Sequence, residues 1–473
     1  MLGIKAKTID GHLINVEPSS LETLKSNLHG KMIAPQDSEY DRARLIWNSI
    51  IDKRPALIVQ CTGTADVIKV VRFAKEHNLL ISVRGAGHNI AGRALENDVI
   101  LIDLSQLRYV HVDPEEATAT VSPGATLSDL DQEAQMYGLA LPVGINSTTG
   151  VAGLTLGGGF GWLSRKYGMT IDSLISAEVI TVDGDRVVCS KDKNTELFWA
   201  IRGGGGNFGV VTSFKFKLHK VGPIVFSGPV VFDIKDAKEV FHRYREFCKN
   251  APDEVTVWTV IRHCPPFPFV DPSYKGKPVL ILVGMYNGPT EKGKEVLSKL
   301  KEMGRTIGDG LAPHPYTAFQ KAFDPLLTPG ARNYWKTHNF KNLDDQLINT
   351  FLEYAQKLPS LQTELFFAQM GGETNRVAKD ATAYPHRDVK FIMNVHTRWE
   401  DKSDDKLCIS WAREFFEAVR PFATGGAYVN FVSEGDENLE GTYLENIEKL
   451  AVIKAKYDPK NILRSNFNIS PKR

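Results

Sequence analysis

Glycine is concentrated in two short stretches of this chain. Of its 39 glycines, seven lie within residues 144–161 and five within residues 203–209. A third, shorter loop at residues 84–89 contains Gly85 and Gly87. Because glycine lacks a side chain, its backbone can turn sharply and its N–H groups can approach a bound phosphate closely. These three glycine loops therefore either serve turns or together surround a large, charged ligand.

The loop at residues 203–209 contains a formal match to the dinucleotide-binding pattern GxGxxG, at residues 204–209. That pattern requires a strand before the loop and a helix after it, so that the helix N-terminus meets the pyrophosphate. Here the order is reversed, because residues 196–200 look helical and residues 210–216 alternate like a strand. No GxxxxGK[ST] motif is present either. We therefore expect neither a Rossmann site nor a nucleoside-triphosphate site.

Composition excludes several classes of partner. The 57 basic and 56 acidic residues leave a net charge of +1, whereas proteins that bind nucleic acid or membrane surfaces usually carry a basic excess. The five cysteines are scattered and never form CxxC, so we expect no disulfide framework and no metal site. Without a signal-peptide-like start or a run of 18 apolar residues, the sequence predicts a cytoplasmic protein, either a monomer or a homo-oligomer.

The chain divides into three parts by composition. Its 473 residues suffice for roughly two to four domains. Up to residue 220 an α/β pattern is expected, with a helix from Thr64 to Asn78, strands at 79–83, 99–104 and 118–121, a helix at 128–137 and a hairpin at 175–189. Residues 221–424 contain little glycine, and the segments 279–285, 292–303, 347–357, 363–370 and 390–399 predict an antiparallel sheet backed by helices. Residues 425–473 look like short strands and turns that fold back onto the first part.

Several motifs together resemble one flavoprotein family. They are residues 84–89 (RGAGHN), 150–161 (GVAGLTLGGGFG), 196–209 (ELFWAIRGGGGNFG) and the C-terminal stretch 457–471. They resemble the berberine-bridge-enzyme-like FAD-linked oxidases, which belong to the vanillyl-alcohol oxidase/p-cresol methylhydroxylase superfamily. The resemblance runs over nearly the whole chain. It implies an α+β fold with a two-part FAD-binding domain, residues 1–220 plus 425–473, and an inserted substrate domain, residues 221–424.

The resemblance also implies how FAD is held. His88 matches the histidine that the family joins covalently to the flavin, whereas the position of a second, cysteine-borne link is Asn146 in this chain. A single covalent bond, to His88, is therefore expected. Further cofactor-binding residues implied by the motifs are Arg84, Gly85, Ala86, Gly87, Asn89, Ser147, Thr148, Gly150, Gly153, Gly157, Gly158, Gly161, Gly209, Val210, Asn466 and Asn468, the last two on one face of a strand.

The motifs suggest three residues for the chemistry. Tyr428 and Asn430 share a face if residues 427–431 form a strand, either as an ordinary edge-strand pair or, as the resemblance implies, with Tyr428 as the general base. A phenol ionises near pH 10, so such a base needs a lowered pKa, for which Lys336 or Arg387 could supply positive charge. Val151 matches a position that gates oxygen in relatives, or else it packs beneath the flavin.

Two polar-aromatic clusters of the central part resemble family segments near the substrate. They contain Tyr334 and Lys336 in one cluster and Tyr384 and Arg387 in the other, and packing between domains is the alternative interpretation. Glu364 and Gln369 fall on opposite faces of their predicted strand, so at most one of them faces a substrate.

The resulting hypothesis is an FAD-dependent oxidase. It would remove a hydride from a C–H bond bearing a hydroxyl or amine group, in a sugar, a secondary or aromatic alcohol or a cyclic amine, with O2 reoxidising the flavin to give H2O2. Two alternatives stay open: a dehydrogenase that uses another electron acceptor, and a flavin-binding structural protein with weak activity. An intact Tyr428 argues against the last one.

Overall fold

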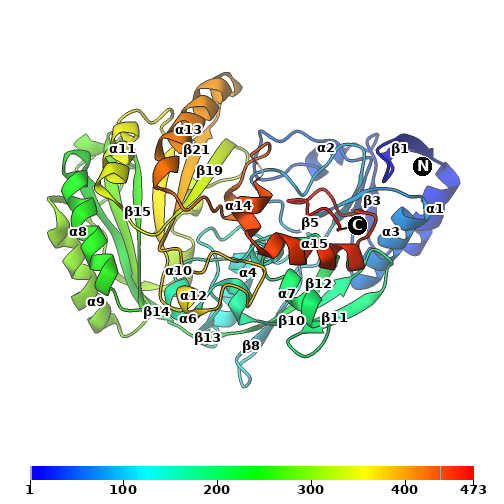
Figure 1. Cartoon of the computed structure of the whole chain (residues 1–473), viewed down its shortest axis with the longest axis horizontal. Helices are drawn as coiled ribbons and strands as arrows, with labels where there is room; N and C mark the ends of the chain where they lie inside the picture. Colours follow the sequence, from blue (N-terminus) through cyan, green and yellow to red (C-terminus); the bar gives the residue numbers. More distant parts are fainter. Residues whose placement is uncertain (1–2, 437, 473) are drawn as a thin grey trace.

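The computed structural model describes residues 3–436 and 438–472. The chain forms two lobes (Figure 1). The middle of the chain, coloured green to orange, makes one lobe, while the blue and cyan N-terminal part and the red C-terminal part lie together in the other. Both lobes combine helices with sheets, so the predicted α+β class is confirmed.

The first sheet is small and mostly parallel. Its order is β3 (Lys31–Ile33), β4 (Leu57–Gln60), β6 (Ile100–Asp103) and β5 (Ile81–Arg84), with β3 antiparallel to β4. Helix α3 (Thr64–Glu76) connects β4 to β5 and buries the predicted apolar stripe that includes Val67, Val70 and Val71. The carboxyl end of β5 leads directly into the 84–89 loop. Near this sheet lie β1 (Ile4–Lys7), β2 (Leu13–Val16), α1 (Pro18–Asn27) and α2 (Tyr40–Ala43).

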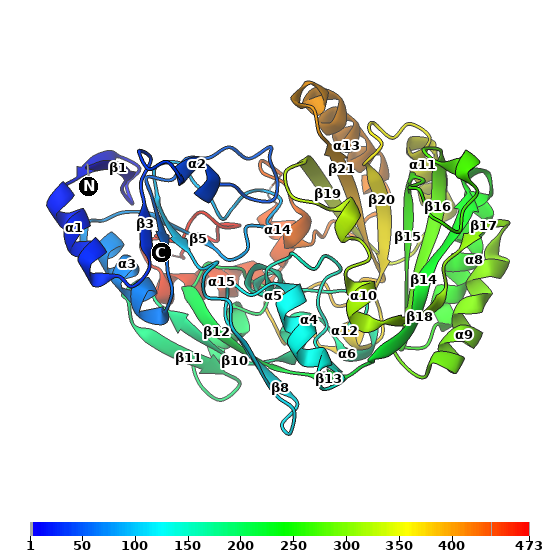
Figure 2. The ribbon, with the colours of Figure 1, turned by 180° about the vertical axis from the view of Figure 1, so that it is seen from behind.

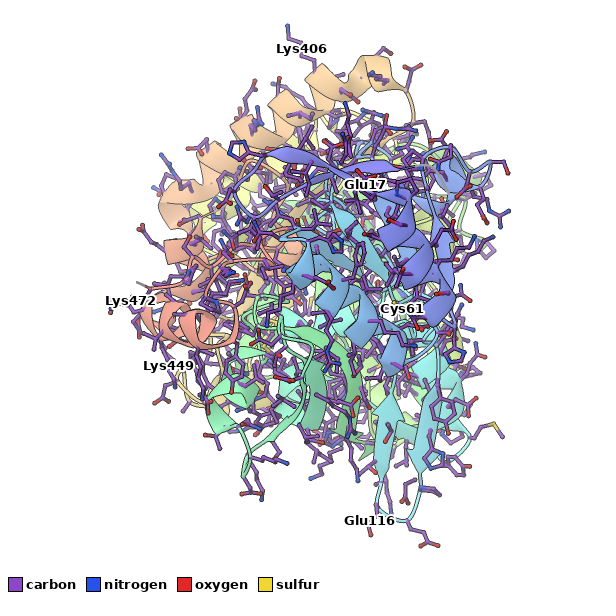
Figure 3. All side chains as sticks on the ribbon, turned by 90° about the vertical axis from the view of Figure 1, so that its right-hand side faces the viewer. Glu17, Cys61, Glu116, Lys406, Lys449 and Lys472 are labelled. Atoms are coloured by element: carbon purple, nitrogen blue, oxygen red, sulfur yellow. The ribbon has the colours of Figure 1, made fainter. Side chains whose placement is uncertain are left out.

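The second sheet of the same lobe is antiparallel. Its order is β11 (Arg186–Ser190), β10 (Leu174–Ile180), β12 (Val210–Lys217), β8 (Thr118–Val121) and β7 (Val110–Asp113). The β10–β11 pair is the predicted hairpin, and Glu116 marks the tip of the β7–β8 hairpin, which extends away from the lobe (Figure 3). Helix α7 (Thr195–Ala200) precedes the 203–209 loop and β12 follows it, which is the reversed order that argued against a Rossmann site.

Short elements carry the remaining glycine loop. Helix α4 (Leu127–Gln135) begins at Thr126, whose side chain and that of Asp129 cap each other's backbone N–H groups. The 144–161 loop contains α5 (Val151–Leu156), and α6 (Ser164–Tyr167) follows it. Strands β9 (Leu139–Ala140) and β13 (His219–Lys220) pair with each other near the passage to the second lobe.

The second lobe is built on one large antiparallel sheet, as predicted. The strands are β14 (Ile224–Asp233), β15 (Val255–His263), β16 (Pro278–Tyr286), β17 (Thr306–Asp309), β18 (Ala312–Pro315), β19 (Arg332–Phe340), β20 (Glu364–Gln369) and β21 (Phe391–Trp399). They follow the order β17-β14-β16-β15-β20-β21-β19, with β18 also paired to β14. Two short helices, α10 (Tyr316–Gln320) and α12 (Glu373–Arg376), lie between strands in sequence.

Both faces of this sheet are buried. Helices α8 (Ala237–Asn250), α9 (Thr290–Ser298), α11 (Asp345–Ala355) and α13 (Asp405–Val419) cover one face, on the outside of the lobe (Figure 2). The other face packs against the first lobe, where Trp258, Phe366 and Ile392 share a core with Phe160 and Trp162. Within the described residues, no helix combines the length and apolar character that crossing a bilayer requires.

The C-terminal part differs from its prediction. Instead of short strands it contains two helices, α14 (Leu439–Tyr443) and α15 (Asn446–Tyr457). The reason is the helical spacing of Leu450, Ile453 and Tyr457, which all join the core of the first lobe. Residues 427–431 also form no strand, because Val429–Phe431 make a single 3₁₀ turn.

A buried ion pair holds α15 to the 203–209 loop. The ammonium of Lys454 donates to Asp458 Oδ2 at 2.7 Å and to the carbonyl of Asn207 at 2.8 Å, and both charged side chains are fully buried. The Asp458 carboxylate in turn accepts the backbone N–H groups of Ile462 and Leu463 at 2.8 and 2.9 Å. One pair of charges thus links α15, a glycine loop and the C-terminal segment.

We predict that Lys454→Met lowers the free energy of unfolding by about 3–5 kcal/mol, because it leaves the Asp458 carboxylate buried without a cation. Equilibrium unfolding in urea measures this change. Lys460→Met removes an exposed lysine just beyond the same helix and should change stability by no more than about 0.5 kcal/mol. Equal effects of the two substitutions would show that the buried pair does not hold the C-terminal part in place.

Candidate functional site

A cavity of about 290 Å³ lies between the two lobes. The glycine loops form one wall, and the inner face of the large sheet forms the other. On the loop side the lining includes residues 85–89, 144–146, 149–150, 152–154, 156–157, 205–206, 209–211 and 466–467. On the sheet side it includes Trp258, Trp335, Glu364, Phe366, Asn394 and His396, with residues 428–432 between the two walls.

His88 presents an unpartnered nitrogen to this region. Its ring lines the cavity and stacks on Trp47, with 4.5 Å between ring centroids. Nε2 is buried and has no hydrogen-bond partner among the described residues. Burial lowers the pKa of His88 to about 4, so the imidazole is neutral at pH 7. The preceding Arg84 does not reach the cavity, because its guanidinium pairs with Asp103 at 2.7 Å.

The glycines of the 144–161 loop serve different purposes. A Cβ on Gly150 would lie 2.8 Å from the Cβ of Ala86, and one on Gly157 would lie 2.4 Å from the Asn430 amide, so both allow two segments to approach closely. Gly153 instead faces open space on the cavity side. Gly158 and Gly161, also predicted to bind the cofactor, do not line the cavity, and Gly161 packs against the backbone of Val143.

Asn146 lines the cavity and orders its own loop. Its side-chain oxygen accepts hydrogen bonds from the N–H and hydroxyl of Thr148 at 3.0 and 2.6 Å. Ser147 and Thr148 themselves are absent from the lining, and Ser147 bonds instead to Asp324 of the other lobe. The predicted contacts of these two residues with a cofactor therefore do not follow from the geometry.

The two C-terminal asparagines do not share a strand face, because their segment is irregular. Asn466 lines the cavity and donates to the carbonyl of Gly206 at 2.9 Å. Asn468 does not line it, although its side-chain oxygen is buried without a partner in the described part of the chain. A residue that the sequence analysis missed, Asn207, fixes the loop by donating to the carbonyls of Gly204 and Phe467 at 2.9 and 3.1 Å.

Tyr428 and Asn430 do meet, although not on a strand. The 3₁₀ turn after Tyr428 brings the Asn430 amide to 3.1 Å from the phenolic oxygen, and the N–H of Gly159 donates to the same oxygen at 3.0 Å. Burial raises the pKa of Tyr428 to about 12, while the two donors act in the opposite direction. The expected lowering of this pKa by a cation is wrong. Lys336 pairs with Asp436 at 2.9 Å and Arg387 with Asp172 at 2.8 Å, so neither charge supports Tyr428.

The structure corrects the predicted substrate cluster on β19. Tyr334 and Lys336 lie on the face of the sheet that packs against α13, where Tyr334 bonds to Asp436 and Arg413. Between them, Trp335 lines the cavity. Alternation along a strand places neighbouring residues on opposite faces, so the two residues that were predicted face away from the cavity.

Three further predicted residues lie outside the cavity lining. Tyr384 packs edge-on against Tyr428, with 6.3 Å between ring centroids, and Arg387 stacks on Tyr384 at 5.4 Å. Val151 is fully buried in the core that contains β8 and α4. Its side chain therefore has no position from which to gate a path into the cavity, and the next residues, Ala152 and Gly153, line the cavity instead.

Comparison with known proteins identifies the family. A family model described as "FAD binding domain" matches residues 55–190, and one described as "Berberine and berberine like" matches residues 427–470. An FAD-linked oxidoreductase of Dictyostelium discoideum is 30% identical over 429 residues, which cover 90% of this chain and 91% of that protein. The chain belongs to the berberine-bridge-enzyme-like FAD-linked oxidoreductases. The predicted family and enzyme class are confirmed, and the cofactor is FAD.

Solved structures agree with this assignment. The crystal structure of 6-hydroxy-D-nicotine oxidase from Arthrobacter nicotinovorans has a TM-score of 0.84 and 28% identity, and the match covers 94% of this chain and 98% of that one. Chitooligosaccharide oxidase has a TM-score of 0.83 and 24% identity, over 96% and 100% of the two chains, which shows a shared fold.

The cavity of this berberine-bridge-enzyme-like protein fits FAD. His88, whose buried Nε2 has no partner among the described residues, lines it, and the backbone N–H groups of Ala86 and Gly87 donate to no described residue. Such groups are costly to bury unless a ligand accepts from them. Gly153 leaves space beside the same loop. Residues suited to hold the cofactor are therefore 85–89, Asn146, Gly150, Gly153, Gly157, Gly209, Val210 and Asn466. No cluster of metal-binding side chains occurs in residues 3–436 and 438–472.

Sequence reasoning missed most of the sheet side of the site. Trp258, Phe366, Asn394 and His396 line the cavity from three neighbouring strands. Glu364 was singled out together with Gln369, and of the two Glu364 lines the cavity, while Gln369 accepts a hydrogen bond from the Val257 N–H. Trp47, which stacks on His88, carries no motif in the sequence. Each of these residues lies in an otherwise ordinary segment, so no local signal marks it.

We predict that Gly153→Ala weakens FAD binding about tenfold or more without destabilising the apoprotein. The new methyl group meets no protein atom within 4 Å but enters the space beside the 84–89 loop, and alanine favours the helical position. Titration with FAD of apoprotein that also carries His88→Ala, so that binding stays reversible, measures the change by flavin fluorescence. Gly63→Ala is the control, because Gly63 also faces open space but lies outside the cavity. Unchanged affinity in Gly153→Ala would place the cofactor away from α5.

Proposed function

We propose that this FAD-linked oxidoreductase is an oxidase that removes a hydride from a C–H bond bearing a hydroxyl or amine group. The observation that carries the proposal is the position of Tyr428, which lines the cavity between the glycine loops and the sheet and whose hydroxyl accepts hydrogen bonds from Gly159 and Asn430. When bound, FAD supplies the redox chemistry, taking the hydride and passing the electrons to O2 to give H2O2. Two relatives with high structural similarity are oxidases by name, of a nicotine derivative and of chitooligosaccharides.

Tyr428 is the residue that we assign to proton removal. Its phenolic oxygen already accepts two hydrogen bonds, from Gly159 and Asn430, and both stabilise the phenolate relative to the phenol. The same two bonds fix the direction in which the oxygen points. Because burial raises the pKa of Tyr428 to about 12, only a small fraction of the phenol is ionised at neutral pH. As long as the pH stays below that pKa, this fraction increases about tenfold with each unit by which the pH rises.

We predict that Tyr428→Phe slows anaerobic flavin reduction by about 10²–10⁴-fold. In the wild type this rate should rise with pH between pH 6 and pH 9, and in the variant the rise should be lost, because the group that deprotonates is absent. Stopped-flow absorbance of the flavin measures both. Tyr384→Phe is the matched control, because its hydroxyl has no partner in the described residues and does not line the cavity. A Tyr428→Phe rate within a factor of a few of the wild type would exclude this role.

We also propose that FAD is held by one covalent bond, to His88. A neutral imidazole with a free nitrogen is an adequate nucleophile, and burial keeps His88 neutral at pH 7. Gly87, with a φ of 70°, lets the backbone turn so that the ring enters the cavity. The amide of Asn146 is not a nucleophile, so no second bond is expected there.

The covalent bond predicts that acid-precipitated wild-type protein stays yellow and that its intact mass exceeds the sequence mass by one FAD. His88→Ala should release the flavin on precipitation yet retain it in the native state, since the backbone contacts and Asn466 remain. A white wild-type pellet would refute the bond, and a yellow His88→Ala pellet would assign it to another residue.

The electron acceptor separates the oxidase from a dehydrogenase. Val151 gives no information on oxygen access, because its side chain is buried away from the cavity. Enzyme reduced anaerobically by a substrate should regain its yellow colour within seconds of admitting air and release one H2O2 per flavin. Slow recovery with air, together with rapid recovery with a quinone, would favour the dehydrogenase.

A further inference from the structure

The N–H of Gly159, which donates to Tyr428, belongs to a peptide unit that is held at its other end as well. A peptide unit is planar, so the carbonyl of Gly158 and the N–H of Gly159 point in opposite directions within one plane. The Gly158 carbonyl accepts the N–H of Ile171 at 3.1 Å, while the Gly159 N–H donates to the Tyr428 oxygen at 3.0 Å. The contact at one end therefore fixes the direction of the donor at the other.

Glycine on both sides leaves this peptide unit able to rotate unless other contacts hold it. Gly158 and Gly159 have φ angles of 124° and 75°, which residues with a side chain rarely adopt. After half a rotation the Gly158 carbonyl would face Tyr428 in place of the N–H. It would then accept a hydrogen bond from the hydroxyl and favour the neutral phenol. The orientation of this one peptide unit therefore decides whether it lowers or raises the pKa of Tyr428.

The 3₁₀ turn Thr170–Ser173 supplies the contacts that hold the peptide unit. The N–H groups of Thr170 and Ile171 donate to the carbonyls of Gly159 and Gly158 at 2.9 and 3.1 Å. Both N–H groups are available because the first N–H groups of a helical turn have no partner within it. A peptide unit that accepts a hydrogen bond at its carbonyl also becomes a stronger donor at its N–H. The turn thus both orients and strengthens the donor that meets Tyr428.

Asp172 holds this turn in place. Its carboxylate accepts the N–H of Met169, at the start of the turn, at 2.8 Å, and its two oxygens each accept from Arg387 at 2.8 Å. Both charged side chains are nearly buried, with exposed fractions of 10% for Asp172 and 1% for Arg387. A bidentate pair of this kind fixes geometry as well as compensating charge. Since the two charges compensate each other, the pair acts on Tyr428 mainly through the position of the turn.

We propose that Asp172 is a positioning residue for Tyr428. Through the turn Thr170–Ser173 it keeps the peptide unit between Gly158 and Gly159 oriented so that the N–H, and not the carbonyl, meets the phenolic oxygen. Asp172 itself does not line the cavity. This inference rests on the proposed function, because the orientation matters to the reaction only if Tyr428 takes up a proton.

The first test measures the titration of Tyr428 itself. Holoenzyme is labelled with difluorotyrosine, whose phenol is more acidic than that of tyrosine, and the fluorine resonance of Tyr428 is assigned by its loss in Tyr428→Phe. Asp172→Ala/Arg387→Met removes the pair without leaving a lone charge, and the titration midpoint should rise by about one pH unit or more. Asp172→Asn/Arg387→Met is the matched control. Its amide oxygen can still accept the Met169 N–H, so its midpoint should stay at the wild-type value.

The second test removes the hydrogen bond to the peptide unit directly. Ile171→Pro deletes the N–H that donates to the Gly158 carbonyl, and proline is tolerated in the first turn of a helix because N–H groups there lack partners within it. Ile171→Val is the matched control, because valine keeps the N–H and has as many side-chain carbons as proline. The midpoint of Tyr428 should rise in the proline variant and stay unchanged in the valine variant.

Retained FAD absorbance reports that each variant is folded. Unchanged midpoints in both Asp172→Ala/Arg387→Met and Ile171→Pro would overturn the inference, and so would equal rises in the two controls. Loss of FAD from both test variants would also overturn it, because the turn would then serve folding. Neither titration uses a substrate, so its result is separate from the flavin-reduction rate of Tyr428→Phe, which tests the proposed function.

Discussion

The site depends on the close approach of backbone at residues 157–159 to the segment that carries Tyr428. A side chain on Gly157 would overlap the Asn430 amide, and the N–H of Gly159 donates to the Tyr428 hydroxyl. Residues more than 260 positions apart in sequence therefore share one small volume. Any Cβ at Gly157 would force Asn430 away. The glycine run at residues 157–161 therefore helps to set the position of Tyr428 beside the cavity. The same run ends at Gly161, which packs on the Val143 backbone and anchors the loop.

How much of the site could be predicted from sequence differs between its two walls. On the loop side, glycine spacing marks the segments, because only glycine permits such backbone contacts. Even there, only some of the residues predicted for the site line the cavity. Asn146, Gly150 and Gly153 do, whereas Ser147, Gly161 and Val151 stabilise the loop or the core. A motif identifies a segment, but which of its side chains faces a ligand depends on turns whose geometry is set by distant partners such as Asp324.

On the sheet side, the alternation of apolar and polar residues does not indicate which face of a strand lines the cavity. Strands β19, β20 and β21 are covered on one side by helices and on the other by the first lobe, so both of their faces are buried. A strand buried on both faces gives no contrast between apolar and polar positions. The sequence analysis therefore selected Tyr334 and Lys336, whereas Trp335 faces the cavity. The C-terminal helix was missed for a related reason: its buried Lys454 masks an otherwise apolar stripe, and the lysine is compatible with the core only because Asp458 lies one turn away.

The charged groups of this protein are arranged so that the cavity carries little net charge. Arg84 pairs with Asp103, Arg387 with Asp172 and Lys336 with Asp436, all outside the cavity lining, and Glu364 is compensated by Arg262 within the wall. An isolated charge in such a buried space would be costly, whereas a compensated pair can fix the position of neighbouring side chains. The consequence for Tyr428 is that none of these paired cations assists its ionisation. In the proposed role of Tyr428 as a base, its ionisation is favoured instead by two neutral donors, Gly159 and Asn430. The close backbone contact at residues 157–159 supplies both of them.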